Sequence, residues 1–180
     1  MNDLEQIASG AVERALASGA TDAECTISEG EEFSATVRMR EVESLKEAGS
    51  RGAGIRVLVG QRTGSSYTSD LSPDGIEKMV SAALELAKIT SEDPHAGLPE
   101  REDLGSLAGD LQLYHDAVAG MGTEWKIAQA RQAESAALAA DPRIQNSEGA
   151  SFDSLNGEDL AWKETRHCQL ETRHTSTLAF

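Results

Sequence analysis

Apolar side chains recur at every second position in two stretches between residues 23 and 39, and this period of two constrains the fold more than any other feature. The alternating residues are Ala23, Cys25, Ile27, Phe33, Ala35, Val37 and Met39. Strict alternation is typical of a strand that buries one face. Because the acidic residues 29–32 between the two stretches indicate a turn, the segment predicts a half-buried antiparallel hairpin.

Glycines at positions 52, 54, 60 and 64 raise the possibility of a phosphate-binding loop. A dinucleotide fingerprint requires Gly-x-Gly-x-x-Gly between a strand and a helix, but Val57 occupies the third glycine position. A P-loop is excluded because no Gly-Lys-Ser/Thr follows. Residues 55–59 alternate and are rich in β-branched types. Gly52 and Gly54 are therefore interpreted as a turn into a strand, which ends at a second turn over residues 60–64.

Three segments show the 3.6-residue apolar period of a helix. The first covers residues 3–18, and the second starts with Ser72 as its N-cap and Pro73 in its first turn. The third covers residues 123–140 and precedes Pro142. Further strands are expected over residues 42–47, 66–69 and 143–152, and a long loop over residues 91–120. The sequence thus predicts an α+β fold, in which helices cover an antiparallel sheet.

Charge and composition restrict the possible partners. The chain has 180 residues with 16 basic and 31 acidic side chains, which give a net charge of −15. This charge opposes binding to nucleic acid or to an anionic membrane. No apolar run is long enough to cross a membrane, and the N-terminus does not resemble a signal peptide. Since Cys25 and Cys168 do not suggest a disulfide framework, a cytoplasmic protein is expected.

Several linked segments together resemble one known family. These are "GATDAECTIS", the run from residue 31 to residue 99, and "DPRIQNSEGASF". Their order resembles the N-terminal domain of the TldD/PmbA family, once called modulators of DNA gyrase, over about residues 4–153. Residues 60–99 are similar to the PmbA (TldE) branch. The resemblance implies a cytoplasmic metallopeptidase system in which a TldD-type and a PmbA-type subunit assemble and cut unfolded or small peptides.

The same resemblance implies where zinc would bind. The TldD branch carries a His-Glu-x-x-x-His helix in which the histidines bind zinc and the glutamate activates water. None of the four histidines here is followed by glutamate: they are His95, His115, His167 and His174. In the family this motif and a further cysteine ligand lie beyond the N-terminal domain, and the PmbA branch lacks the motif. No catalytic, cofactor-binding or metal-binding residue is therefore assigned, zinc is expected only in a TldD-type partner, and the chain is expected to be inactive alone.

Other candidate sites are less favoured than structural interpretations. The tail gathers possible zinc ligands at unestablished spacing, namely His167, Cys168, Glu171 and His174. An irregular solvated tail is favoured over a metal site there. Cys25, at an inward strand position, is interpreted as a small buried side chain and not as a nucleophile. The acidic pairs at residues 31–32 and 92–93 are interpreted as solvated turn and loop charges.

The composition changes after residue 153. Residues 1–153 are therefore interpreted as the family-like domain, and residues 154–180 as a divergent tail that proteases should trim readily. We hypothesise that the reading frame shifts near residues 154–157. Codons permitted for residues 167–170, read one base later, encode Ala-Asn, as the family would have. An intact gene frame with no family-like continuation downstream would contradict this hypothesis.

Two other functions remain open at this point. One is an independent acidic module that holds a protein partner through a sheet edge or the third helix. The other is a small metal-binding protein that uses the tail. Co-expression with a TldD-type subunit would separate the family function from the independent module, because only the former requires that partner to change its peptide hydrolysis.

Overall fold

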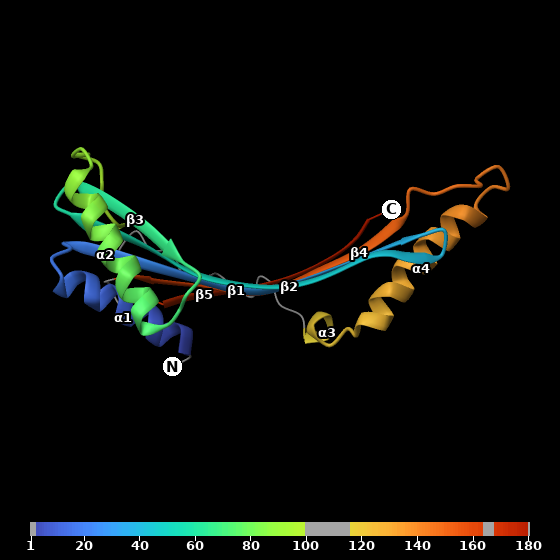
Figure 1. Ribbon diagram of the computed structural model, residues 1–180, viewed down its shortest axis with the longest axis horizontal. Coiled ribbons are helices and arrows are strands. Elements are labelled where there is room, and N and C mark those ends of the chain that lie inside the picture. The colour runs from blue at the N-terminus through green and yellow to red at the C-terminus, as the bar shows by residue number, and fades with distance from the viewer. Residues whose placement is uncertain (1–2, 100–115, 164–167, 180) are drawn as a thin grey trace. The chain divides into compact units, whose positions relative to one another are not determined.

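A computed structural model describes residues 3–99, 116–163 and 168–179 of the chain (Figure 1). Its elements, in order, are α1 (Asp3–Ala17), β1 (Asp22–Arg38), β2 (Glu41–Val59), β3 (Arg62–Thr68), α2 (Pro73–Ile89), α3 (Asp116–Ala119), α4 (Thr123–Ala139), β4 (Ala150–Lys163) and β5 (Cys168–Ala179). The strands form an antiparallel sheet of five strands in the order β3-β2-β1-β4-β5. The predicted α+β fold with its order of helices and strands is confirmed.

The chain divides into two compact units that share strands. Unit 1 consists of Met1–Glu29, Arg51–Gly109 and Glu158–Glu171. Unit 2 consists of Gly30–Ser50, Asp110–Gly157 and Thr172–Phe180. Strands β1, β2, β4 and β5 each contribute residues to both units.

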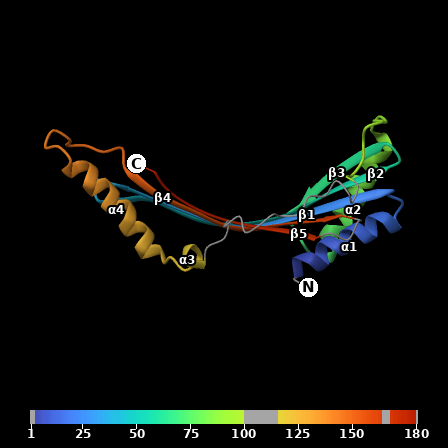
Figure 2. The ribbon, with the colours of Figure 1, turned by 180° about the vertical axis from the view of Figure 1, so that it is seen from behind.

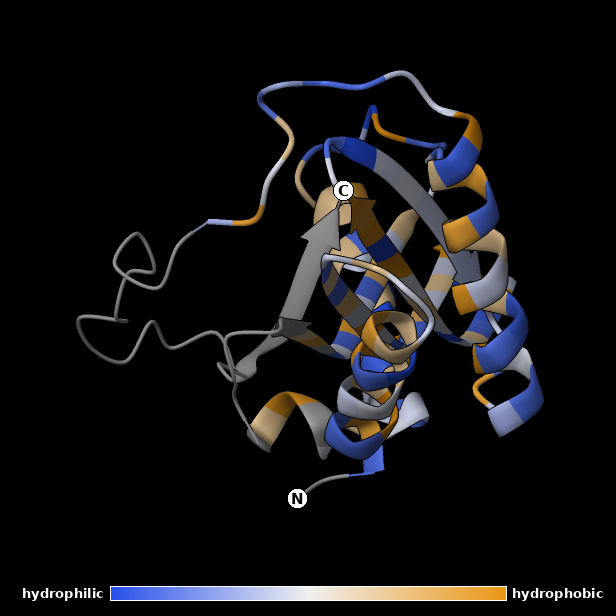
Figure 3. Cartoon of the chain, turned by 90° about the vertical axis from the view of Figure 1, so that its left-hand side faces the viewer, coloured by the Kyte–Doolittle hydropathy of each residue, from blue (hydrophilic) through white to orange (hydrophobic). Residues whose placement is uncertain are grey.

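Unit 1 places α1 and α2 against its part of the sheet, and α2 contacts both α1 and β3 (Figures 1 and 2). Its core joins the inward side chains of β1 and β2 to the apolar stripes of both helices. Leu160 of β4 also belongs to this core. The largest of its buried residues are Leu4, Val12, Ile27, Ile55, Val57, Ile76, Met79, Val80, Leu84 and Leu160. Figure 3 shows apolar and polar residues alternating along the helices, as one buried and one exposed face require.

Unit 2 has a smaller core beneath α4. Its buried apolar residues are Phe33, Ala35, Val37, Ala130 and Phe152. The rings of Trp125 and Phe152 meet edge to face, with their centroids 5.8 Å apart. Helix α4 is rich in alanine, and its buried residues are Ala130, Ala133 and Glu134. Among the residues that the structure describes, α4 therefore gives unit 2 few large apolar contacts.

The turn predicted over residues 29–32 is wrong. These residues lie inside β1, where Glu29, Glu31 and Glu32 are exposed. The chain reverses instead at Met39 and Arg40, whose φ angles of 49° and 71° place two non-glycine residues in the left-handed region. Glutamate does not distinguish a turn from an exposed strand position, because both carry charged side chains readily.

The glycine turn predicted at Gly52 and Gly54 is also wrong, because both residues lie inside β2. The strand over residues 55–59 is confirmed as the end of β2. It leaves through Gly60, with φ of 60°, into β3, so that Val59 pairs with Arg62. The segment therefore forms a hairpin whose turn contains Gly60, and no helix follows Gly54.

The strand predicted over residues 143–152 begins and ends too early, because residues 143–149 are not in a strand and β4 starts at Ala150. Strand β4 extends to Lys163, with Ser154 8% and Leu160 1% exposed, so residues 154–163 form part of the sheet instead of an irregular tail. Of the loop predicted over residues 91–120, residues 91–99 form a loop, and residues 100–115 lie outside the described residues. Residues 116–119 form the short helix α3, which the prediction missed. The domain boundary at residue 153 and the frame shift stay predictions.

Candidate functional site

The described residues contain no group of three or more His, Cys, Asp or Glu side chains placed to hold a metal ion. His95 lies exposed in the loop after α2, where its backbone N–H donates to Asp93 at 2.9 Å. The remaining candidates lie outside the residues whose side chains are described: His115, His167, Cys168, Glu171 and His174. A metal site in the tail therefore stays a hypothesis.

Cys25 is fully buried in β1, within the core of unit 1. Burial raises the pKa of its thiol to about 12. Because the thiolate is the reactive form, the thiol is protonated and unreactive at neutral pH. Cys25 thus packs as a small apolar side chain.

We expect Cys25 to resist labelling in the native chain. In a Cys168→Ser variant, a thiol-specific chromogenic disulfide at neutral pH should react at least about 100-fold more slowly with the native than with the denatured chain. The denatured sample is the control for complete labelling. Stoichiometric reaction of the native protein within minutes would show that Cys25 is accessible.

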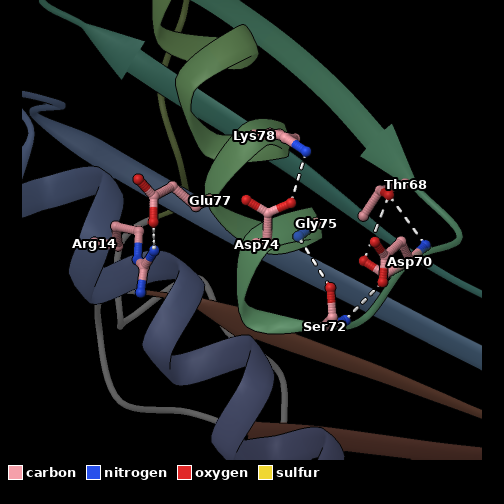
Figure 4. Close-up of polar contacts among 8 residues, drawn as sticks. All are labelled: Arg14, Thr68, Asp70, Ser72, Asp74, Gly75, Glu77 and Lys78. Carbon is pink, nitrogen blue, oxygen red and sulfur yellow. Dashed lines mark hydrogen bonds and ion pairs between the residues drawn. The ribbon is translucent and has the colours of Figure 1, made fainter.

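The start of α2 is built from local polar contacts (Figure 4). The Ser72 hydroxyl accepts a hydrogen bond from the Gly75 N–H at 3.2 Å, which confirms Ser72 as the N-cap. Asp70 accepts from the Ser72 N–H at 3.0 Å, and its hydrogen bonds with Ser72 lower the pKa of its carboxyl. Asp74 pairs with Lys78 one turn later, at 2.6 Å. These polar groups pair with one another and stabilise the first turn of α2.

Replacing Ser72 with alanine should lower the free energy of unfolding by about 1 kcal/mol, because the first turn of α2 loses its side-chain acceptor. A Ser72→Asp variant should retain most of the stability, since aspartate also caps helices. Urea unfolding followed by circular dichroism measures both. Equal stability of Ser72→Ala and the unaltered chain would contradict a capping role.

A groove between α1 and α2 in unit 1 has a volume of about 570 Å³. Arg14 from α1 pairs with Glu77 from α2 at 2.8 Å, and Lys88 pairs with Glu85 at 2.6 Å. Figure 4 shows the Arg14–Glu77 pair between the two helices. Since each basic side chain already has an acidic partner, the groove offers no uncompensated charge for a ligand.

Unit 2 contains a buried carboxylate that the sequence analysis missed. Glu134 of α4 is 1% exposed, and its two oxygens accept hydrogen bonds from the N–H groups of Met39 and Arg40, both at 2.7 Å. Burial alone would raise its pKa. Hydrogen bonds from Arg40, Met39 and Ser147, with the charge of Arg40, outweigh burial and hold the pKa of Glu134 below its usual value. Glu134 therefore fixes the left-handed turn between β1 and β2.

A small cleft lies beside α4 in the same unit. Its Lys126 ammonium group donates to the Ser154 hydroxyl at 2.8 Å and lies 4.6 Å from the centre of the Phe33 ring. Glu31 and Glu47 also line the cleft, whose volume of about 60 Å³ is that of about two water molecules. The cleft can hold little more than the tip of a side chain.

Comparison with known proteins identifies the fold's relatives. Residues 23–87 match the family described as PmbA/TldA metallopeptidase domain 1. The chain is 41% identical over 155 residues to the metalloprotease PmbA homolog of Haemophilus influenzae, and 43% identical over 155 residues to metalloprotease PmbA of Escherichia coli O157:H7. Both alignments cover 86% of this chain and 34% of the relative. The chain thus spans about a third of the length of these relatives.

Solved structures share the fold at low sequence identity. A protein described as a modulator of DNA gyrase from Bacteroides thetaiotaomicron superposes with a TM-score of 0.87 at 20% identity, over 99% of this chain and 40% of that chain. TldE from Thermococcus kodakarensis gives 0.81 at 13% identity, over 93% and 37% of the two chains. Together with the sequence matches, these define the first domain of a metallopeptidase family. The chain belongs to the PmbA/TldD family, and its domain is of the PmbA/TldE-like kind.

One further observation concerns membranes. None of the helices that the structure describes is long and apolar enough to cross a bilayer.

Proposed function

We propose that the chain is the N-terminal region of a PmbA-like subunit that acts with a TldD-type subunit in cytoplasmic peptide proteolysis or maturation. The observation that carries this proposal is the identity of 41–43% to PmbA metalloproteases over 86% of the chain. The TldE-like fold supports it. In this role the chain contributes binding surface, and its partner contributes the chemistry.

In this proposal zinc belongs to the TldD-type partner. None of the four histidines in the sequence is followed by glutamate, so the chain lacks the His-Glu-x-x-x-His pattern in which histidines bind zinc and glutamate activates water. In the structure, Glu134 and Lys126 of unit 2 and the Arg14–Glu77 pair in the groove of unit 1 make structural contacts. The net charge of −15 makes nucleic acid and anionic membranes poor partners.

Co-expression with a TldD-type subunit from the same genome tests the proposal. The two chains should co-purify, and the pair should cleave an unstructured fluorogenic peptide at a different rate from the TldD-type subunit alone. Changing the motif glutamate of the TldD-type subunit to glutamine should abolish cleavage, which locates the chemistry in that subunit.

The chain alone is the second control. By itself it should contain no stoichiometric zinc by elemental analysis and should not cleave the peptide. Either about one zinc per chain or cleavage by the chain alone would contradict a non-catalytic role. Unchanged hydrolysis by the TldD-type subunit in its presence, without co-purification, would favour an independent binding module.

A further inference from the structure

Residues 41–50 of β2, which belong to unit 2, have an open edge in the described structure. In the sheet β2 lies between β3 and β1, but its pairing with β3 covers only Ala53 to Val59, where Ala53 faces Thr68. Along residues 41–50, the edge that would face β3 meets no strand of the described residues. The backbone N–H and C=O groups along such an edge can pair with another strand. We call residues 41–50 the β2 open edge.

Both faces of the β2 open edge are exposed. Every residue from position 41 to position 47 is exposed, including Val42 at 38% and Leu45 at 49%. Side chains alternate between the two faces of a strand, and these two positions are three apart, so each face carries one apolar side chain. An added strand would therefore find apolar contacts on either face.

The charge of the β2 open edge is predominantly acidic. Residues 41–50 carry three acidic residues, Glu41, Glu43 and Glu47, and one basic residue, Lys46. Lys46 is paired with Glu32 at 2.9 Å, and Glu43 lies 3.5 Å from Arg38. Within the described part of the chain, Glu41 and Glu47 have no ion-pair partner. The charge that complements this edge is positive.

We propose that the β2 open edge binds an extended, basic peptide as an additional strand of the sheet. Main-chain hydrogen bonds to the edge provide the affinity, and apolar side chains of the peptide contact Val42 and Leu45. Basic side chains of the peptide pair with Glu41 and Glu47, which favours basic over acidic peptides. This inference names a class of peptide for the proposed function and rests on that function for its biological setting.

A second copy of the chain fits this edge less well than a basic peptide. Pairing two copies would bring Glu41, Glu43 and Glu47 of both chains together, and like charges on paired strands are destabilising. The same argument disfavours any acidic partner. Charge therefore selects among the occupants that main-chain pairing alone would admit.

Peptide binding to the 180-residue chain tests the proposal without any TldD-type subunit, so it can fail separately from the proposed function. The probe is a fluorescein-labelled peptide of about eight residues that alternates lysine and valine, a length typical of strands. Its anisotropy should rise saturably with added protein at low salt. N-methylation of alternate peptide bonds should weaken binding at least about 10-fold, because it removes main-chain donors. A peptide that alternates glutamate and valine should not bind.

Charge reversal places the interaction on the β2 open edge. The double variant Glu41→Lys/Glu47→Lys should lower the affinity for the lysine-valine peptide at least about 10-fold at low salt. The matched control Asp3→Lys/Glu13→Lys reverses two exposed acidic charges on α1 and should leave binding within about 2-fold of the unaltered chain. Thermal melts of both variants verify that they fold.

Amide hydrogen exchange locates the bound peptide by an independent measurement. Addition of the lysine-valine peptide should slow exchange within residues 41–50. Equal weakening by both double variants, undiminished binding of the N-methylated peptide, or protection confined to α1 and α2 would each overturn the proposal. A chain dimer that Glu41→Lys/Glu47→Lys disrupts, with no peptide binding, would instead assign the edge to a second copy.

Discussion

Replacing Gly64 with alanine should destabilise the chain by about 3 kcal/mol or more, because over-packing against rigid backbone is costly. Gly64 lies in β3 beneath α2. A Cβ atom there would lie 2.6 Å from the backbone nitrogen of Ala87 and would clash with the carbonyl oxygen of Ala83. Both obstacles are helix backbone, which cannot move without displacing the buried stripe of α2. Urea unfolding followed by circular dichroism measures the loss.

The matched control is Gly54→Ala, in the neighbouring strand. A Cβ atom at Gly54 would lie 3.4 Å from the Thr26 hydroxyl oxygen, which is ordinary contact with a side chain. Its effect should stay below about 1 kcal/mol, within the range of ordinary strand substitutions. If Gly64→Ala were as stable as Gly54→Ala, α2 would not pack on β3 as closely as the structure shows.

Replacing Glu134 with leucine should lower the free energy of unfolding by about 1.5–3 kcal/mol, the range for hydrogen bonds to a charged group. The substitution leaves the N–H groups of Met39 and Arg40 without their acceptors while both residues keep a left-handed conformation. Glu134→Gln should lower the free energy of unfolding by less, because the glutamine amide oxygen still accepts one hydrogen bond. Glu124→Gln, at an exposed position of the same helix, should change stability little.

The contribution of Glu134 should also depend on pH. The pKa of its carboxyl is lowered in the folded chain from an ordinary value of 4.5. A lowered pKa gives stability that is fully present above the unfolded-state pKa and is lost as pH falls through the folded-state pKa. The stability difference between the unaltered chain and Glu134→Gln should therefore be constant near neutral pH and shrink below about pH 4.5. A difference that grows on acidification would contradict the sign of the pKa shift.

Local signals explain what the sequence could predict. The ends of helices α1 and α2 lie close to the predicted ends, because residues at or beside the helix ends mark them. Ser72, the N-cap of α2, is one such residue. Alternation correctly identified the buried positions of β1 from Ala23 to Val37, but not Met39, which lies in the turn and is 48% exposed. It did not show that both alternating stretches belong to one strand, because the exposed acidic residues 29–32 interrupt the apolar pattern without interrupting the backbone.

Long-range contacts explain what the sequence could not predict. The turn at Met39 and Arg40 contains no glycine, and the carboxylate that stabilises it comes from Glu134, 95 positions from Met39. A carboxylate inside an alanine-rich helix with an irregular apolar stripe was the one available signal. The β2 open edge depends on where β3 ends in the sheet, which the sequence of β2 alone does not contain. The lack of a histidine followed by glutamate, by contrast, is visible in the sequence itself.

The shared strands of the two units have a consequence for folding kinetics. Unit 1 joins Met1–Glu29 to Glu158–Glu171, and unit 2 likewise consists of three separate segments. Such contacts between distant parts of the chain must overcome a large loop-closure entropy before they contribute stability, which slows folding. No single cut of the chain separates the two cores. The core of unit 1 includes Leu160 and that of unit 2 includes Phe152, so synthesis must reach these residues before the cores can be completed. Unpaired strands stay exposed to aggregation until then.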